Sequence, residues 1–374
     1  MQTKPHYAIL DGLRGVAALM VIWYHIFEGF ATSPIDQKFN HGYLAVDFFF
    51  ILSGFVIGYA YDDRWKTMGI GEFFKRRLIR LHPMVILGAV FGVIAFIIQG
   101  CVQWNGTHVG AGSIILSLVL SMLLIPCLPS GYAEVRGNGE MFPLNGPAWS
   151  LFFEYIGNIC YALFIRRFST KVLAIWTAIL GVIYAWFAIF NVSGYEMVGV
   201  GWTMMDNVNI FGGLLRMMFP FSLGMLLARN FRPTRVRGIF WIAIAVLFAL
   251  FSVPFFPSVN GICVNGIFEM CCIMLIFPSL VWLGASGVTS DKASTGVCKF
   301  LGDLSYPLYI VHYPVMYLFY AWLIKNQLYT LGETWQVVAC VYATNVLLAF
   351  AALKLYDEPV RKWLAGKLKI GVKK

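Results

Sequence analysis

The first hydrophobic segment of the chain carries an arginine and a histidine whose spacing suits chemistry inside a membrane. Arg14 and His25 stand 11 residues apart in "LDGLRGVAALMVIWYH". At about 100° and 1.5 Å per residue, they share one helix face and are separated by about 16 Å. An anion held at Arg14 would extend along that face to His25, where an imidazole can serve as a general base. The alternatives are a positive anchor at the membrane surface for Arg14 and a hydrogen-bonded packing residue for His25.

Two glutamates near or within the hydrophobic segments are further candidates. Glu28 is three residues beyond His25, so it either orients the imidazole or is solvated at the outer interface. Glu154 follows a break in "NGPAWSLFFEY", in which Trp149 is an interfacial anchor. An intramembrane glutamate can relay protons, bind the acceptor or pair with an arginine, and a purely structural ion pair is the remaining interpretation.

A dense basic patch stands before the third hydrophobic segment, in "FFKRRLIRLHP". It contains Lys75, Arg76, Arg77 and Arg80, and the last two are expected to project together at i, i+3. Such a patch binds anionic lipid headgroups in most membrane proteins, whereas paired guanidinium groups also suit a soluble ligand rich in phosphate. Together with Arg14, the patch suggests a phosphorylated donor that enters from the cytoplasm.

A polar stripe lies in "LSYPLYIVHYPV", which contains Ser305, Tyr309 and His312. Tyr309 and His312 are three residues apart and can share a helix face. Hydroxyl and imidazole groups on one face would suit a ligand with many hydroxyl groups. An aromatic packing stripe is the alternative.

The composition places these residues in a protein that spans the membrane several times. Of its 374 residues, 59% are hydrophobic and 12% are charged, and the mean hydropathy is +0.74. The formal net charge of +10 is explained by basic residues in cytoplasmic loops, so no nucleic-acid partner is expected. The eight cysteines form no CxxC pair and lie mostly in apolar runs, so neither a metal site nor a disulfide is expected.

Several segments reach the length of about 20 apolar residues that a membrane span requires. They lie near residues 12–31, 42–61, 84–104, 148–165, 172–191, 207–228, 238–256, 262–285, 302–324 and 334–356. The basic connections and the basic tail from about 360 to 374 all face the cytoplasm if the run 111–128 is re-entrant or interfacial. The expected fold is therefore an all-α polytopic bundle of about ten spans. Both termini are expected in the cytoplasm, and residues 1–374 are expected to form a single transmembrane domain.

Six motifs together resemble the acyltransferase-3 family of integral membrane acyltransferases. They occur in the family's order between Leu10 and Trp363, so the resemblance covers almost the whole chain. The motifs are "LDGLRGVAALMVIWYH", "AVDFFFILSGFVIG", "FFKRRLIRLHP", "NGPAWSLFFEY", "LSYPLYIVHYPV" and "YDEPVRKW". Each is short, so their order carries the resemblance.

The resemblance implies transfer of an acyl group, most often acetyl from acetyl-CoA, across the bacterial inner membrane. The implied acceptor is a hydroxyl of a glycan or glycoside. The resemblance also implies a functional requirement for Arg14 and His25, and a functional role for the arginine-rich block that contains Arg77 and Arg80.

The family's WSL-x3-E pattern falls on Trp149, Ser150 and Glu154. Here Tyr155 follows the glutamate, where the family often has glutamine, so the role of Glu154 stays open. Some family members also carry a C-terminal esterase-like SGNH domain, which we do not expect here.

We therefore expect a membrane O-acyltransferase with cytoplasmic acyl-CoA as donor and His25 as general base on the acceptor hydroxyl. Direct transfer requires fewer steps than a covalent acyl-histidine intermediate. Glu154 is the third catalytic candidate after His25 and Arg14. The residues expected to hold the coenzyme A phosphates are Arg14, Arg76, Arg77 and Arg80. The residues expected to bind the acceptor are Trp149, Ser150, Ser305, Tyr309 and His312. The alternative function is a proton-coupled transporter or a flippase of a sugar-containing substrate.

Overall fold

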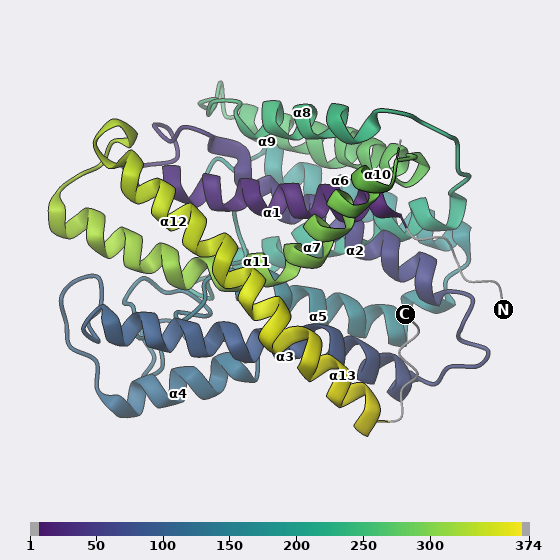
Figure 1. Ribbon diagram of the computed structural model, residues 1–374. Helices are drawn as coiled ribbons and strands as arrows, with labels where there is room; N and C mark the ends of the chain where they lie inside the picture. The colour runs from purple at the N-terminus through teal and green to yellow at the C-terminus, as the bar shows by residue number, and fades with distance from the viewer. Residues whose placement is uncertain (1–6, 290, 369–374) are drawn as a thin grey trace. The chain divides into compact units, whose positions relative to one another are not determined.

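Helices form the regular secondary structure of the computed structural model, which describes residues 7–289 and 291–368 (Figure 1). The α-helices are α1 Ala8–Glu28, α2 Ala45–Tyr61, α3 Ile70–Ile98, α4 Ala111–Met122, α5 Ala148–Leu163, α6 Thr170–Ile189, α7 Asn207–Asn230, α8 Ile239–Phe251, α9 Val264–Cys271, α10 Phe277–Ser286, α11 Lys292–Asn326, α12 Leu331–Ala351 and α13 Glu358–Lys367. Two short 3-10 helices are η1 Asn40–Leu44 and η2 Ile165–Arg167, and two π-helical turns are η3 Cys272–Ile276 and η4 Ala352–Asp357. The last six residues of the expected basic tail, 369–374, lie outside the described residues.

The expectation of a polytopic all-α bundle is confirmed. Within the described ranges, 9 helical segments are long and apolar enough to cross a membrane. α9, η3 and α10 join into one such segment, and α12, η4 and α13 into another. The chain is therefore an integral, multi-pass membrane protein.

Two of the expected hydrophobic segments form shorter helices. α8 has 13 residues and occupies only part of the span expected at 238–256. It ends before Val253, because a residue that precedes a proline, here Pro254, is disfavoured in the helical conformation. α4 has 12 residues and stops ahead of Pro126, within the run 111–128 that was expected to be re-entrant or interfacial.

Contacts within the chain divide it into two compact units. The first takes the chain up to Lys66, together with Phe153–Gly201 and Val208–Ser305. In this unit α1 packs against η1, α2, α8 and α10, and α6 packs against α9. Small residues let helix backbones approach closely. A Cβ atom at Gly15 would lie 2.3 Å from the carbonyl oxygen of Leu301, so α1 and α11 touch there.

The second unit comprises Thr67–Phe152, Trp202–Asn207 and the chain from Tyr306 onward. Within it, α3 packs against α4 and α13. The connection between α4 and α5 folds onto the end of α3, where Phe96, Val135 and Leu144 form a buried apolar cluster. Gly92 makes this possible, because a Cβ atom there would lie 2.0 Å from the carbonyl oxygen of Leu144.

Candidate active site

Arg14 is held on α1 by contacts with the first part of α11. Its Nε atom donates to Ser305 Oγ at 2.8 Å, and its Nη2 atom donates to the carbonyl oxygen of Gly302 at 3.1 Å. Nη2 also lies 3.3 Å from Asp11 Oδ1, and the Arg14 side chain is 25% exposed. The structure thus brings together two residues from the sequence-predicted set, Arg14 and Ser305, that are 291 positions apart in the chain.

His25 lies in the last turn of α1 and forms a hydrogen-bonded pair with Glu28. Its Nδ1 atom is 2.7 Å from Glu28 Oε2. The Tyr24 ring stands edge-on to the imidazole, with the ring centroids 4.9 Å apart. The backbone N–H of Gly29 donates to the carbonyl oxygen of His25, so the helix continues through the pair. An imidazole that is paired with a carboxylate in this way can accept and release a proton.

Glu154 receives a hydrogen bond from α2. Ser53 Oγ donates to Glu154 Oε1 at 2.7 Å, and the glutamate is half-buried on α5. The carbonyl oxygen of Glu154 also accepts a hydrogen bond from Asn158 Nδ2 at 2.7 Å. The Ser53 contact fixes the carboxylate between two helices of the first unit.

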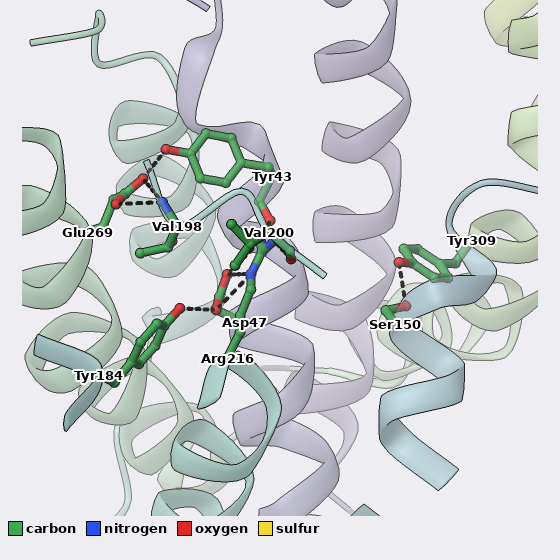
Figure 2. Close-up of polar contacts among 9 residues, drawn as sticks. All are labelled: Tyr43, Asp47, Ser150, Tyr184, Val198, Val200, Arg216, Glu269 and Tyr309. Carbon is green, nitrogen blue, oxygen red and sulfur yellow. Dashed lines mark hydrogen bonds and ion pairs between the residues drawn. The ribbon is translucent and has the colours of Figure 1, made fainter. Parts of the chain in front are cut away.

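A second polar cluster joins the start of α5 to the later part of α11 within the second unit. The Ser150 and Tyr309 hydroxyl oxygens are 2.7 Å apart (Figure 2). Ser150 Oγ also donates to the carbonyl oxygen of Pro147 at 3.0 Å. The His312 ring lies 5.8 Å from the Tyr309 ring, and its Nδ1 atom donates to the Tyr309 carbonyl oxygen at 2.8 Å. Ser150, Tyr309, His312 and the adjacent Trp149 are all buried.

The basic patch occupies the first turns of α3. Arg76 pairs with Glu72, one turn earlier, through contacts of 3.0 Å and 2.5 Å. Arg77 is buried, whereas Arg80 and Lys75 are exposed to solvent. The i, i+3 pair Arg77 and Arg80 therefore presents one guanidinium to the interior and one to the surface.

A buried aspartate, Asp357 in the motif "YDEPVRKW", interacts with an arginine of this patch. Asp357 lies at the end of η4, and Arg361 Nη2 is 2.6 Å from its Oδ2 atom. Arg80 exerts a favourable electrostatic interaction on the same carboxyl group. A π-helical turn of this kind often occurs at functional sites, and α13, which follows it, packs against α3.

Sequence reasoning missed a buried charge pair in the first unit. Arg216 on α7 donates to both carboxylate oxygens of Asp47, with contacts of 2.9, 3.1 and 3.2 Å (Figure 2). Its remaining donors reach the carbonyl oxygens of Tyr43 at 2.8 Å and Val200 at 3.3 Å. The Tyr184 hydroxyl donates to Asp47 at 3.3 Å. This network ties α2, α6, α7 and the connection before α7 together.

Glu269 is a second buried carboxylate, and Tyr43 links it to the Asp47–Arg216 pair. The Tyr43 hydroxyl donates to its carboxylate, and the backbone N–H of Val198 donates to both carboxylate oxygens at 3.1 and 3.0 Å (Figure 2). Glu269 and Arg216 are ionisable residues inside expected spans, which is the sequence signal that would have found them.

The connection between α4 and α5 contains a buried acidic group in the second unit. Tyr317 donates its hydroxyl to Glu140, and Asn138 Nδ2 donates to Glu140 Oε1 at 3.0 Å. The Arg136 guanidinium stacks over the Tyr317 ring at 3.4 Å from the centroid. Burial raises the pKa of Glu140 to about 7 from its ordinary value of 4.5.

This shift predicts a stability that falls as the pH rises. The folded state binds the Glu140 proton more tightly than the unfolded state, so the contribution is complete below about pH 4.5 and disappears as the pH passes about 7. Glu140→Gln should remove the decline. The expected difference in unfolding free energy between the native protein and the variant changes by about 3 kcal/mol across this window. Thermal unfolding of both proteins in detergent at the two pH limits measures it, and parallel pH dependences would contradict the assignment.

Comparison with known proteins identifies similarity along most of the chain. A family model described as "Acyltransferase domain" matches residues 7–354. The O-acetyltransferase OatA of Staphylococcus aureus is 24% identical over 94% of this chain, and the match spans 57% of OatA's own length. "Protein 2 in picA locus" of Rhizobium radiobacter is 34% identical over 46% of this chain and 88% of its own length. The acyltransferase MdmB of Streptomyces mycarofaciens is 30% identical over 42% of this chain and 38% of its own length. No solved structure matches.

Proposed function

The chain belongs to the acyltransferase-3 family of integral membrane acyltransferases, and from that membership we propose the reaction it performs. The protein transfers an acyl group, acetyl foremost, from cytoplasmic acyl-CoA to a hydroxyl of a glycan or glycoside on the outer side of the membrane. The observation that carries this proposal is the family match over residues 7–354. OatA and MdmB, named as an O-acetyltransferase and an acyltransferase, support the reaction type.

The proposed general base is His25, which the structure pairs with a carboxylate. The imidazole takes the proton from the acceptor hydroxyl as its oxygen attacks the thioester carbonyl carbon. The carbon–sulfur bond then breaks, and the protonated imidazole returns the proton to the departing thiolate of coenzyme A. The bonds and protons balance without a covalent acyl-enzyme intermediate, and no metal ion takes part.

The donor is proposed to be bound through its phosphates by guanidinium groups. In the first unit this role falls to Arg14, whose contacts with Ser305 and Gly302 fix the side chain on α1. Ser305 is therefore proposed to hold Arg14, and the acceptor-binding role that the sequence pattern predicts for it stays a prediction. In the second unit the corresponding residues are Arg76, Arg77 and Arg80.

The proposed acceptor-binding residues carry hydroxyl, imidazole and indole groups suited to a sugar. In the second unit they are Ser150, Tyr309, His312 and Trp149. Glu154 in the first unit, hydrogen-bonded to Ser53, is proposed to bind an acceptor hydroxyl. If α8 is counted as a short tenth crossing, both termini and the basic connections face the cytoplasm, which the positive-inside rule favours. We propose the bacterial inner membrane as the location.

Replacing Arg80 with glutamine tests the donor assignment. A charge-assisted hydrogen bond contributes about 1.5–3 kcal/mol, so the KM for acetyl-CoA should rise by about 10-fold or more while kcat changes little. Arg167→Gln is the matched control, because Arg167 is an exposed arginine from another basic connection and should leave the KM unchanged. Steady-state kinetics in membranes with equal protein levels provide the measurement. An unchanged KM in Arg80→Gln would leave only the lipid-headgroup role for the patch.

A further inference from the structure

We infer that Glu28 is the positioning residue of His25 and that Nε2 of His25 is the atom that takes the acceptor's proton. The inference deepens the proposed function and rests on it. A contact of 2.7 Å between His25 Nδ1 and Glu28 Oε2 pairs the carboxylate with one of the two nitrogens of the ring.

The helix itself fixes the geometry of this pair. His25 and Glu28 are at i and i+3, so their side chains stand on neighbouring positions of one helix face. Glu28 is the last residue of α1, and the bond from the Gly29 N–H to the His25 carbonyl oxygen keeps this turn helical. Tyr24 packs edge-on against the imidazole, and its carbonyl oxygen accepts a hydrogen bond from Gln37 at 3.3 Å. The ring is therefore held from two sides.

This geometry determines the chemistry of the two ring nitrogens. An ionised carboxylate only accepts hydrogen bonds, so Nδ1 must carry a hydrogen and donate it to Glu28. In the neutral ring, the lone pair is then on Nε2, and a base that keeps its contact with Glu28 acts through that atom. When Nε2 takes the proton from the acceptor hydroxyl, the positive charge on the imidazole forms beside the Glu28 carboxylate. The same proton leaves Nε2 for the thiolate of coenzyme A.

The exposure of the two side chains agrees with this division of roles. The His25 side chain is 14% exposed and the Glu28 side chain is 39% exposed, so the carboxylate keeps part of its hydration while the ring is largely enclosed. A partly hydrated carboxylate stays ionised at low cost, whereas a fully buried one requires compensating hydrogen bonds. Glu28 is therefore placed to act on His25 and not as a proton donor to the substrate.

A series of variants at Glu28 tests this role. Glu28→Ala should lower kcat by about 10- to 100-fold and leave the KM for acetyl-CoA unchanged, because the ring loses its orientation but the donor contacts stay. Glu28→Gln should retain part of the activity, because its amide oxygen still accepts the Nδ1 hydrogen but carries no charge. Glu333→Gln is the matched control, because this glutamate on α12 also pairs with a nearby side chain, Thr330, and should leave both constants unchanged.

The double variant separates positioning from a purely structural role. In a His25→Ala background, Glu28→Ala should cause no further loss of activity, because the residue acts only through the imidazole. A further loss of the same factor as in the native background would overturn the inference. Full activity of Glu28→Ala together with an inactive His25→Ala would also overturn it and leave the proposed function standing. Full activity of His25→Ala would instead remove the base assignment itself. If Glu28→Ala fails to fold, Glu28→Gln tests the same role. A kcat of Glu28→Gln equal to that of the native protein would overturn the role of the carboxylate charge.

Discussion

Replacing His25 with alanine should reduce acyl transfer by about 10²- to 10⁴-fold while the protein stays folded. The reason is that the acceptor hydroxyl is a poor nucleophile until a base removes its proton, and His25 is the proposed base. The Arg14 contacts with Ser305 and Gly302 lie about 16 Å away along α1, so binding of the donor phosphates should persist. The loss should therefore appear in kcat and not in the KM for acetyl-CoA.

The measurement is transfer of labelled acetyl from acetyl-CoA to an isolated glycan fraction, in membranes that contain equal amounts of each protein. His108→Ala serves as the control, because His108 is an exposed histidine in the connection between α3 and α4. It should retain full activity. Full activity of His25→Ala would exclude the imidazole as the base.

Replacing Asp47 with alanine should destabilise the protein by about 3–5 kcal/mol, because the substitution leaves the buried Arg216 guanidinium without its counter-charge. Asp47 is fully buried and Arg216 is 2% exposed, so water cannot replace the lost partner. Arg216→Ala should have a similar effect through the uncompensated carboxylate. The double variant Asp47→Leu with Arg216→Met should cost less than either single change, because it leaves no unpaired charge.

Thermal unfolding in detergent micelles measures these effects. The matched control is Lys354→Ala, which removes an ion pair of the same kind with Glu358 whose side chains are 45% and 31% exposed. An exposed pair contributes about 1 kcal/mol or less, so this control should unfold close to the native temperature. An Asp47→Ala variant as stable as Lys354→Ala would show that the buried pair is not what holds α2 to α7.

Hydropathy was sufficient to predict the fold class, because a membrane span is a long and nearly continuous apolar run. The exceptions have a local cause: α4 and α8 are short where Pro126 and Pro254 follow them. Both prolines are visible in the sequence. The length of the helix that precedes each proline also depends on how that helix packs against its neighbours.

Individual contacts in the candidate site were predicted only where both residues lie on one helix. His25 and Glu28 are three residues apart, so helical spacing was enough to propose their contact. The contacts of Arg14 with Ser305 and of Asp47 with Arg216 join residues 291 and 169 positions apart. No periodicity in a single sequence relates such positions, so only the folded chain reveals them.

Ser305 is an example of a residue whose contact the sequence alone does not reveal. Its place in one stripe with Tyr309 and His312 suggested a shared role in binding the acceptor. The three are on the same helix, but Ser305 contacts Arg14, whereas Tyr309 contacts Ser150. A helix as long as α11, with 35 residues, can serve different sites along its length.

The most direct test of the proposed reaction uses the purified protein in proteoliposomes. Acetyl-CoA with separate labels on the acetyl group and on the adenine is supplied outside, and a soluble glycan is enclosed. We expect acetyl label bound covalently to hydroxyls of the enclosed glycan and adenine label that stays outside, whereas vesicles with His25→Ala should contain no acetylated glycan. Entry of both labels together, or export of unmodified glycan without any acetylation, would contradict the account and identify a transporter.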